Sequence, residues 1–197
     1  MSAREEILAA VRGALRNADR SEVDVPRGYR SAVANDFVEL FAERVAGYRA
    51  TLTRCTTASL PETIRAALGP ARKVLVPDGF PAEVDGVPAS AVRTTAELAG
   101  FDAVVTTAAL GIAATGTIVL DHGRGQGRRA LSLVPDVHMC VLREDQIVPG
   151  VPHAVAALDP ARPQTWISGP SATSDIELTR VEGVHGPRTL HVILVAP

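Results

Sequence analysis

Short runs that are apolar at consecutive positions constrain the fold of this chain more than any other feature. Two of them, HMCVL (138–142) and LHVILV (190–195), are largely apolar on both sides of a strand rather than at alternate positions. Such strands are buried on both faces, which is typical of parallel sheets covered by helices. From about Ala50 onward these runs alternate with helical segments. The sequence therefore predicts an α/β fold with a mostly parallel sheet flanked by helices.

The boundaries of the expected elements follow from this alternation and from turn and capping residues. The expected strands are TLTRC (51–55), KVLVP (73–77), DAVVTT (102–107), GTIVLD (116–121), HMCVL (138–142), QTWIS (164–168) and LHVILV (190–195). The expected helices are 59–69, with Ser59 and Glu62 as a capping box, then 94–100, 128–133, 153–158 and 175–181.

The first 49 residues precede the short apolar runs and are expected to form an N-terminal helical extension. Ser2 and Glu5 match a capping box, and a second helix is expected to begin near Asn35 or Asp36. The apolar stripes of the two helices must cover either the main domain or a partner chain. The sequence thus predicts two parts, residues 1–49 and an α/β domain over residues 50–197. The apolar positions of the stripes are Ile7, Leu8, Val11 and Leu15 in the first helix and Phe37, Leu40, Phe41, Val45 and Tyr48 in the second.

Composition excludes several classes of protein. The formal net charge is −2, which argues against nucleic acid as a partner, and no stretch reaches the ~20 apolar residues of a membrane span. The start of the chain does not match a secretory signal. Cys55 and Cys140 form no disulfide framework, CxxC pair or zinc pattern, so no metal site is predicted. We expect a reduced, cytoplasmic protein without a membrane span, and a homo-oligomer is left open.

The segment SGPSATSD (168–175) holds an unusual number of hydroxyl and carboxylate groups after an expected strand. Gly169 permits a tight turn, and Ser174 with Glu177 marks a helix start. Ligands of open α/β sheets collect where strands end and helices begin, and a helix start attracts anions. Gly169, Ser171, Thr173 and Asp175 are therefore candidate ligand-binding residues. The alternative is that these side chains satisfy only their own loop.

Two further segments offer candidates of the same kind. In VEGVHGP, the glycines and a proline hold His185 in a turn, where it could exchange a proton or cap the preceding helix. The small residues Thr115, Gly116 and Thr117 lead into a strand and would permit close approach of a ligand or of another backbone. His185 is the candidate catalytic residue, and the three small residues are candidate ligand contacts.

The segment HGRGQGRR (122–129) is a glycine-rich, strongly basic loop. Its glycines miss the spacing of the dinucleotide fingerprint, and no phosphate-loop lysine is present. Arg124, Arg128 and Arg129 are candidate anion ligands. Arg129 is preferred among them because a following helix would fix its backbone.

Three of these segments resemble a known family. They are GIAATGTIVL (111–120), RRALSLVPDVHMCVL (128–142) and ISGPSATSDIELTRVEGVHGPRTLHVILV (167–195), in this order. Together they resemble the LUD-domain family and, within it, the lactate-utilisation protein C group, from about residue 50 to the end. The resemblance implies a fold of the NagB/RpiA/CoA-transferase kind. It also implies a role, with two partner proteins, in the oxidation of L-lactate to pyruvate.

The residues limit what this chain could do in such a system. Lactate oxidation removes two electrons, which side chains cannot store without a cofactor. An iron–sulfur cluster needs about four thiolates, and the chain has two cysteines. The first hypothesis is therefore a non-redox subunit that has no cofactor of its own, binds a small anionic ligand and works with iron–sulfur partner proteins.

Two other hypotheses stay open. The chain could be a stand-alone isomerase or an acyl- or CoA-transferase-like enzyme acting on a small carboxylate or a sugar phosphate, or it could be a scaffold without a ligand. The family often carries an acidic residue where this chain has Ala114. This departure weakens the enzyme hypothesis, because such reactions use a positioned carboxylate.

Overall fold

The structure is a computed structural model that describes residues 2–21, 23–26, 28, 36–173, 181–183 and 185–197. The chain divides into two compact units, Met1–Arg30 and Ser31–Pro197. The division expected from the sequence, after residue 49, lies later in the chain than this one. In the part of the chain that the structure describes, no helix has the length and hydropathy needed to cross a membrane.

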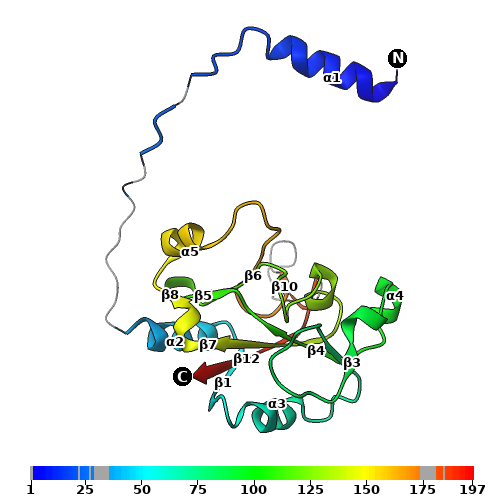
Figure 1. Ribbon diagram of the computed structural model, residues 1–197, viewed down its shortest axis with the longest axis vertical. Helices are drawn as coiled ribbons and strands as arrows, with labels where there is room; N and C mark the ends of the chain where they lie inside the picture. The colour runs from blue at the N-terminus through cyan, green and yellow to red at the C-terminus, as the bar shows by residue number, and fades with distance from the viewer. Residues whose placement is uncertain (1, 22, 27, 29–35, 174–180, 184) are drawn as a thin grey trace. The chain divides into compact units, whose positions relative to one another are not determined.

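A parallel sheet of six described strands forms the centre of the larger unit (Figure 1). Every neighbouring pair in it is parallel, which confirms the predicted α/β class. In spatial order the strands are β1 (Thr51–Thr56), β12 (Thr189–Ala196), β7 (Val137–Arg143), β4 (Ala103–Thr107), β2 (Val74–Val76) and β3 (Val87–Pro88).

The two faces of this sheet are buried against different elements. On one face, Met139, Val141 and Ile193 pack with Leu60 and Ile64 of α3 (Leu60–Leu68). Neighbouring positions on β7 and β12, including Cys140, Leu142, Val192 and Leu194, point to the other face and are fully buried there. Burial of successive residues on opposite faces explains why these strands are apolar at consecutive positions.

A second, smaller sheet covers the face opposite α3. Its strands are ordered β8 (Ile147–Val148), β5 (Leu110–Ile112), β6 (Thr117–Leu120) and β9 (Thr165–Ile167). The strands expected from GTIVLD and QTWIS are thus not members of the parallel sheet, because β6 pairs antiparallel with both β5 and β9. The physical reason is the short connection between β5 and β6, the single turn η2 (Ala113–Thr115). A parallel crossover would need a dozen or more residues.

The two N-terminal helices were predicted correctly but differ in their surroundings. In the first unit, α1 (Ala3–Ala14) has the expected capping box of Ser2 and Glu5 and buries no residue. In the second unit, α2 (Phe37–Gly47) begins after Asp36, whose carboxylate accepts the Glu39 N–H at 3.0 Å. Phe41 and Val45 of α2 are buried in the core cluster that contains Cys140 and Leu142.

The remaining elements are short, and several differ from their expected form. Ser59 precedes α3 but makes no side-chain capping bond, so the capping box expected there is wrong. The helix expected over 128–133 is a 3-10 turn, and that expected over 153–158 begins earlier. These elements are η1 (Ala89–Ala91), α4 (Thr95–Leu98), η3 (Arg129–Ser132), η4 (Glu144–Gln146), α5 (Val151–Ala157), β10 (Ala172–Thr173) and β11 (Val181–Glu182). Most of the helix expected over 175–181 lies outside the described residues.

Candidate functional site

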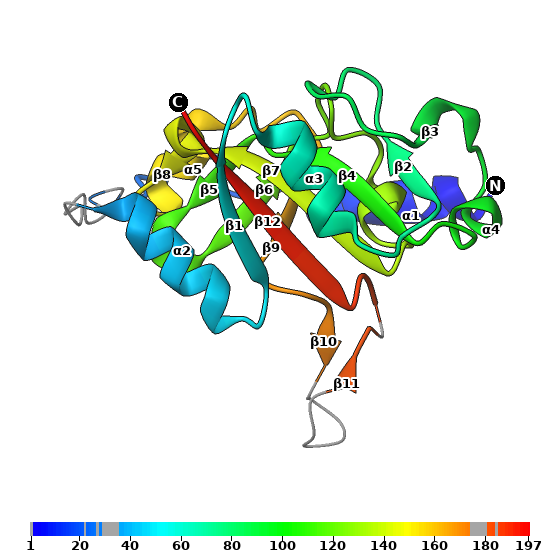
Figure 2. The same cartoon turned by 90° about the horizontal axis from the view of Figure 1, so that it is seen from below.

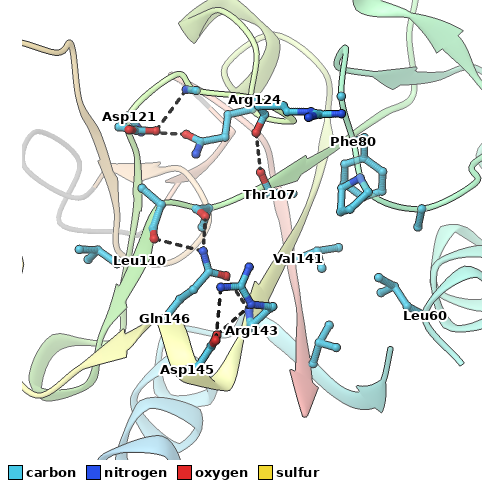
Figure 3. A pocket seen from close by; sticks show the side chains of 18 of the residues that line it. Leu60, Phe80, Thr107, Leu110, Asp121, Arg124, Val141, Arg143, Asp145 and Gln146 are labelled. Carbon is cyan, nitrogen blue, oxygen red and sulfur yellow. Dashed lines mark hydrogen bonds and ion pairs between the residues drawn. The ribbon is translucent and has the colours of Figure 1, made fainter. Parts of the chain in front are cut away.

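A large cleft lies where the parallel strands end. Segments that follow β2, β4 and β7 line it, and its volume is about 1290 Å³. We call it the carboxyl-edge cleft, after its position in the sheet (Figure 3). Ligands of open α/β sheets bind at this edge. Its principal lining residues are Leu60, Phe80, Thr107, Arg124, Val141 and Gln146.

One wall of the cleft is apolar and continuous with the core. Leu60, Val141 and Val195 line it and are 6%, 4% and 3% exposed. Phe80 is half-buried and packs against the same core cluster. Because these side chains are held by core packing, the wall is rigid and presents a fixed apolar surface.

The loop that carries Arg124 is bonded to the end of β4. The Thr107 N–H donates to the Gly125 carbonyl at 2.8 Å, and the Thr107 hydroxyl donates to the Arg124 carbonyl at 3.2 Å. The Gly125 N–H in turn donates to the Asp78 carbonyl at 3.0 Å. These bonds fix the backbone of Arg124 at the rim of the cleft.

The same loop is fixed from behind by a buried amide. Gln126 is 5% exposed, and its side-chain oxygen accepts the N–H groups of Asp121 at 2.8 Å and His122 at 3.0 Å. The Nδ1 of His122 lies 3.0 Å from the Gly127 carbonyl, and its Nε2 lies 3.0 Å from the Thr165 hydroxyl. A carbonyl can only accept, so the Nδ1 of His122 carries a hydrogen and donates it to Gly127.

Three arginines line the cleft, and two of them are neutralised by carboxylates. The Nε of Arg143 lies 2.9 Å from Asp145, and a guanidinium nitrogen of Arg162 lies 2.9 Å from Asp121. Arg124 makes no side-chain hydrogen bond or ion pair with any described residue. Its side chain is exposed and extends toward Phe80 (Figure 3). The cleft therefore presents one guanidinium that is free to bind an anion.

The predicted site residues lie elsewhere, in separate groups. Thr115 and Thr117 are joined by a 2.7 Å hydroxyl contact, and Thr117 lies 2.8 Å from the Ser168 hydroxyl. A side chain at Gly116 would meet Arg44 of α2, and one at Gly169 would meet Tyr48 just beyond it. The close approach predicted for Gly116 thus occurs, but it is made by another part of the backbone.

Ser171 and His185 form a second group. The Ser171 hydroxyl accepts the His185 N–H at 3.2 Å, and the Ser171 N–H donates to the Pro187 carbonyl at 2.9 Å. Thr173 lies in β10, and Asp175 lies outside the described residues. Figure 2 shows the β10–β11 hairpin beside the start of β12, whereas the carboxyl-edge cleft lies at the strand ends.

Among the described residues, no hydrogen bond or ion pair joins the Arg129 side chain to either group. Arg129 opens η3, is exposed, and makes no side-chain bond with a described residue. Arg128, the other candidate of that loop, donates to the carbonyls of Arg93 at 2.9 Å and Val92 at 3.1 Å, which gives it a structural role. Of the candidate residues that the structure describes, Arg124 lines the carboxyl-edge cleft and the others do not.

The sequence pattern does not point to this cleft, because it predicts QTWIS (164–168) as a parallel strand. The end of such a strand would lie at the ligand-binding edge of the sheet. In the structure this segment is β9 of the small sheet. The residues at the ends of the other expected strands could have indicated the cleft. Asp78, Gly79 and Phe80 follow KVLVP, and Thr107 ends DAVVTT.

The comparisons with known proteins agree with this fold. A family model described as the LUD domain matches residues 29–195. A protein of Deinococcus radiodurans named lactate utilization protein C is 52% identical over 169 residues, which cover 81% of this chain and 80% of that protein. A protein of the same name from Halalkalibacterium halodurans is 35% identical over 102 residues, 47% of this chain and 44% of the relative.

A solved structure shows the same architecture. A crystal structure of a DUF162 family protein from Deinococcus radiodurans has a TM-score of 0.69 and 45% identity, and the match covers 81% of this chain and 96% of that chain. The family model, the sequence relatives and the shared fold together lead to one conclusion: this chain belongs to the LUD-domain family.

Proposed function

We propose that this protein is a non-redox subunit of an L-lactate utilisation system and that it binds a small anionic ligand in the carboxyl-edge cleft. The relatives named lactate utilization protein C support the role in lactate utilisation. The single observation that carries the second part is Arg124, a cleft arginine without a carboxylate partner among the described residues.

In this proposal the electrons leave through partner proteins. Oxidation of L-lactate to pyruvate releases two electrons and two protons, and iron–sulfur clusters in the partners would accept the electrons. The cysteines of this chain are poor cluster ligands. Burial raises the pKa of the Cys140 thiol to about 12, and Cys55 lies on another strand with its pKa also raised by burial. A cluster needs thiolates, about four of them.

The chemistry assigned to this chain is binding and positioning. The Arg124 guanidinium would hold a carboxylate by charge-assisted hydrogen bonds, while the Thr107 and Gln126 contacts keep its loop in place. Asp121 and Asp145 are paired with arginines, so neither is a ready general base. The isomerase and transferase alternatives would have to use Glu83 or Asp159, which also line the cleft and have no arginine partner among the described residues.

The predicted site at His185 is retained as a second proposal for ligand handling. His185 is exposed, and its backbone is fixed by Ser171. It belongs to a different part of the molecule from Arg124, so the two proposals can be separated by mutation.

The test is lactate-dependent growth of a strain lacking this chain, complemented with the wild type, Arg124→Ala or His185→Ala. We expect deletion to abolish growth and Arg124→Ala to reduce lactate-dependent dye reduction about tenfold or more, the effect of one charge-assisted bond. Loss with His185→Ala alone would move the ligand site to the Ser171 turn. Full growth of both variants would favour a scaffold, and turnover of a sugar phosphate or CoA ester by the isolated chain would favour an enzyme.

A further inference from the structure

The carboxyl-edge cleft is large for a ligand of the size of lactate. Its volume of about 1290 Å³ exceeds the roughly 300–1,000 Å³ of pockets that bind drug-sized molecules. Lactate and pyruvate are far smaller than such molecules. If one of them bound to Arg124, most of the cleft would still face water.

The side chains that line the cleft also differ in polarity from one part of it to another. Leu60, Phe80, Val141 and Val195 form its apolar wall, and Glu83 lines the cleft three residues after Phe80. Figure 3 shows Leu60 and Phe80 on one side and Asp121, Asp145 and Gln146 on the other. Arg124 extends toward Phe80, so its free charge lies next to the apolar wall rather than beside Asp121 or Asp145.

We infer that the cleft binds an organic anion with an apolar body, either an acyl chain or an aromatic ring. The anionic head pairs with Arg124, and the body lies against Phe80 and Leu60. This inference rests on the proposed binding of an anion in the cleft and adds the ligand class. An anion without an apolar body leaves the wall in water and gains nothing from it.

Binding to the full-length protein, measured by isothermal titration calorimetry, tests the ligand class with two matched pairs. Pyruvate is compared with phenylpyruvate, and inorganic phosphate with phenyl phosphate. The member with the ring should bind on the order of tenfold more tightly, the gain expected from burying the equivalent of one or two methylene groups. The better of the two pairs identifies the head as a carboxylate or a phosphate.

Two variants test which part of the cleft binds the anionic head and which part binds the apolar body. Arg124→Ala should weaken both members of the preferred pair about tenfold or more, because both share the anionic head. Phe80→Ala should weaken only the ring-bearing member, bringing it to the affinity of the small anion. Phe80→Leu keeps an apolar side chain and should retain most of the gain, so that a general loss of packing in Phe80→Ala can be recognised.

The matched controls are an arginine and an aromatic residue outside the cleft. Arg65→Ala, on the exposed surface of α3, and Trp166→Ala, at a side chain 40% exposed on β9, should leave all four affinities unchanged. Equal affinity within each pair, with binding still dependent on Arg124, would overturn this inference and leave the proposed function standing. Absence of binding by all four anions would overturn both.

Discussion

At the scale of single residues, burial decides which groups can carry charge. His138 is 1% exposed on the central strand β7, and its Nε2 lies 2.8 Å from the Thr106 hydroxyl. Burial lowers its pKa from 6.5 to about 4. Cys140, two residues further along the strand, has its pKa raised by burial. Both side chains are therefore neutral at pH 7 and belong to the core rather than to a site.

The histidine makes stability depend on pH in a defined window. The pKa of His138 is lower in the folded protein than the ordinary value of 6.5, so the unfolded chain takes up the proton first as the pH falls. The free energy of unfolding should therefore decrease between about pH 6.5 and pH 4, by roughly 3 kcal/mol in total. Above about pH 6.5 His138 is neutral in both the folded and the unfolded protein, so it no longer makes the free energy of unfolding depend on pH. Chemical denaturation at several pH values measures the slope.

The variant His138→Gln removes the titration and keeps a group able to bond to Thr106. It should show a flatter dependence of stability on pH than the wild type. Some slope will remain because burial also lowers the pKa of His191. Identical slopes for the two proteins would contradict the assignment to His138.

Gly79 is a residue whose backbone supports the candidate site. Its φ angle is +77°, and an added Cβ would overlap the side chain of Arg124. Gly79→Ala should therefore destabilise the protein by about 1–3 kcal/mol and move Arg124. Gly47→Ala, in helix α2 with no atom within 4 Å of the added Cβ, is the control and should be neutral or slightly stabilising. A similar loss of stability in both variants, measured by urea unfolding, would contradict this role.

The arginines of the basic loop show how much of the candidate site can be predicted from residue types alone. Sequence spacing identified the basic loop and its three arginines but could not rank them. The ranking depends on contacts from Thr107, Gly79 and Val92, which are distant in sequence. The sequence favours Arg129 as the anion ligand because a following helix would fix its backbone. In the structure this segment is only a short 3-10 turn. The cleft arginine is Arg124, whose loop is fixed instead by bonds to β4.

At the scale of elements, two helices with similar sequence patterns have different surroundings. Helix α2 buries Phe41 completely, whereas Val11 of α1 is 48% exposed. Phe41→Ala should cost about 3–5 kcal/mol, because it removes a ring that contacts the core. Val11→Ala should change stability by less than about 0.5 kcal/mol. Urea unfolding of both variants measures the contrast, and comparable losses would show that α1 is also packed against a folded surface.

Elements were predictable from sequence where apolar runs are long. The strands β4, β7 and β12 contain three, four and five consecutive apolar residues, and the sequence predicts all three. The strands β3, β8 and β10 are two residues long, too short for any periodicity to show. The sheet to which a strand belongs depends on its partners, as β9 demonstrates. Because this choice is non-local, the sequence pattern of QTWIS (164–168) does not reveal that the strand belongs to the small sheet.

At the scale of the whole molecule, the division into two units predicts the effect of truncation. Removing Met1–Arg30 deletes α1, which buries no residue, so the melting temperature should fall by less than about 2–4 °C, the shift expected from about 1 kcal/mol. Removing residues 1–49 also deletes α2 with its buried Phe41 and Val45, and should lower the melting temperature far more. Equal decreases would contradict the division. If the shorter truncation keeps its stability and its anion binding but no longer supports growth on lactate, then Met1–Arg30 contacts a partner protein, because the loss cannot arise from the fold or from the cleft.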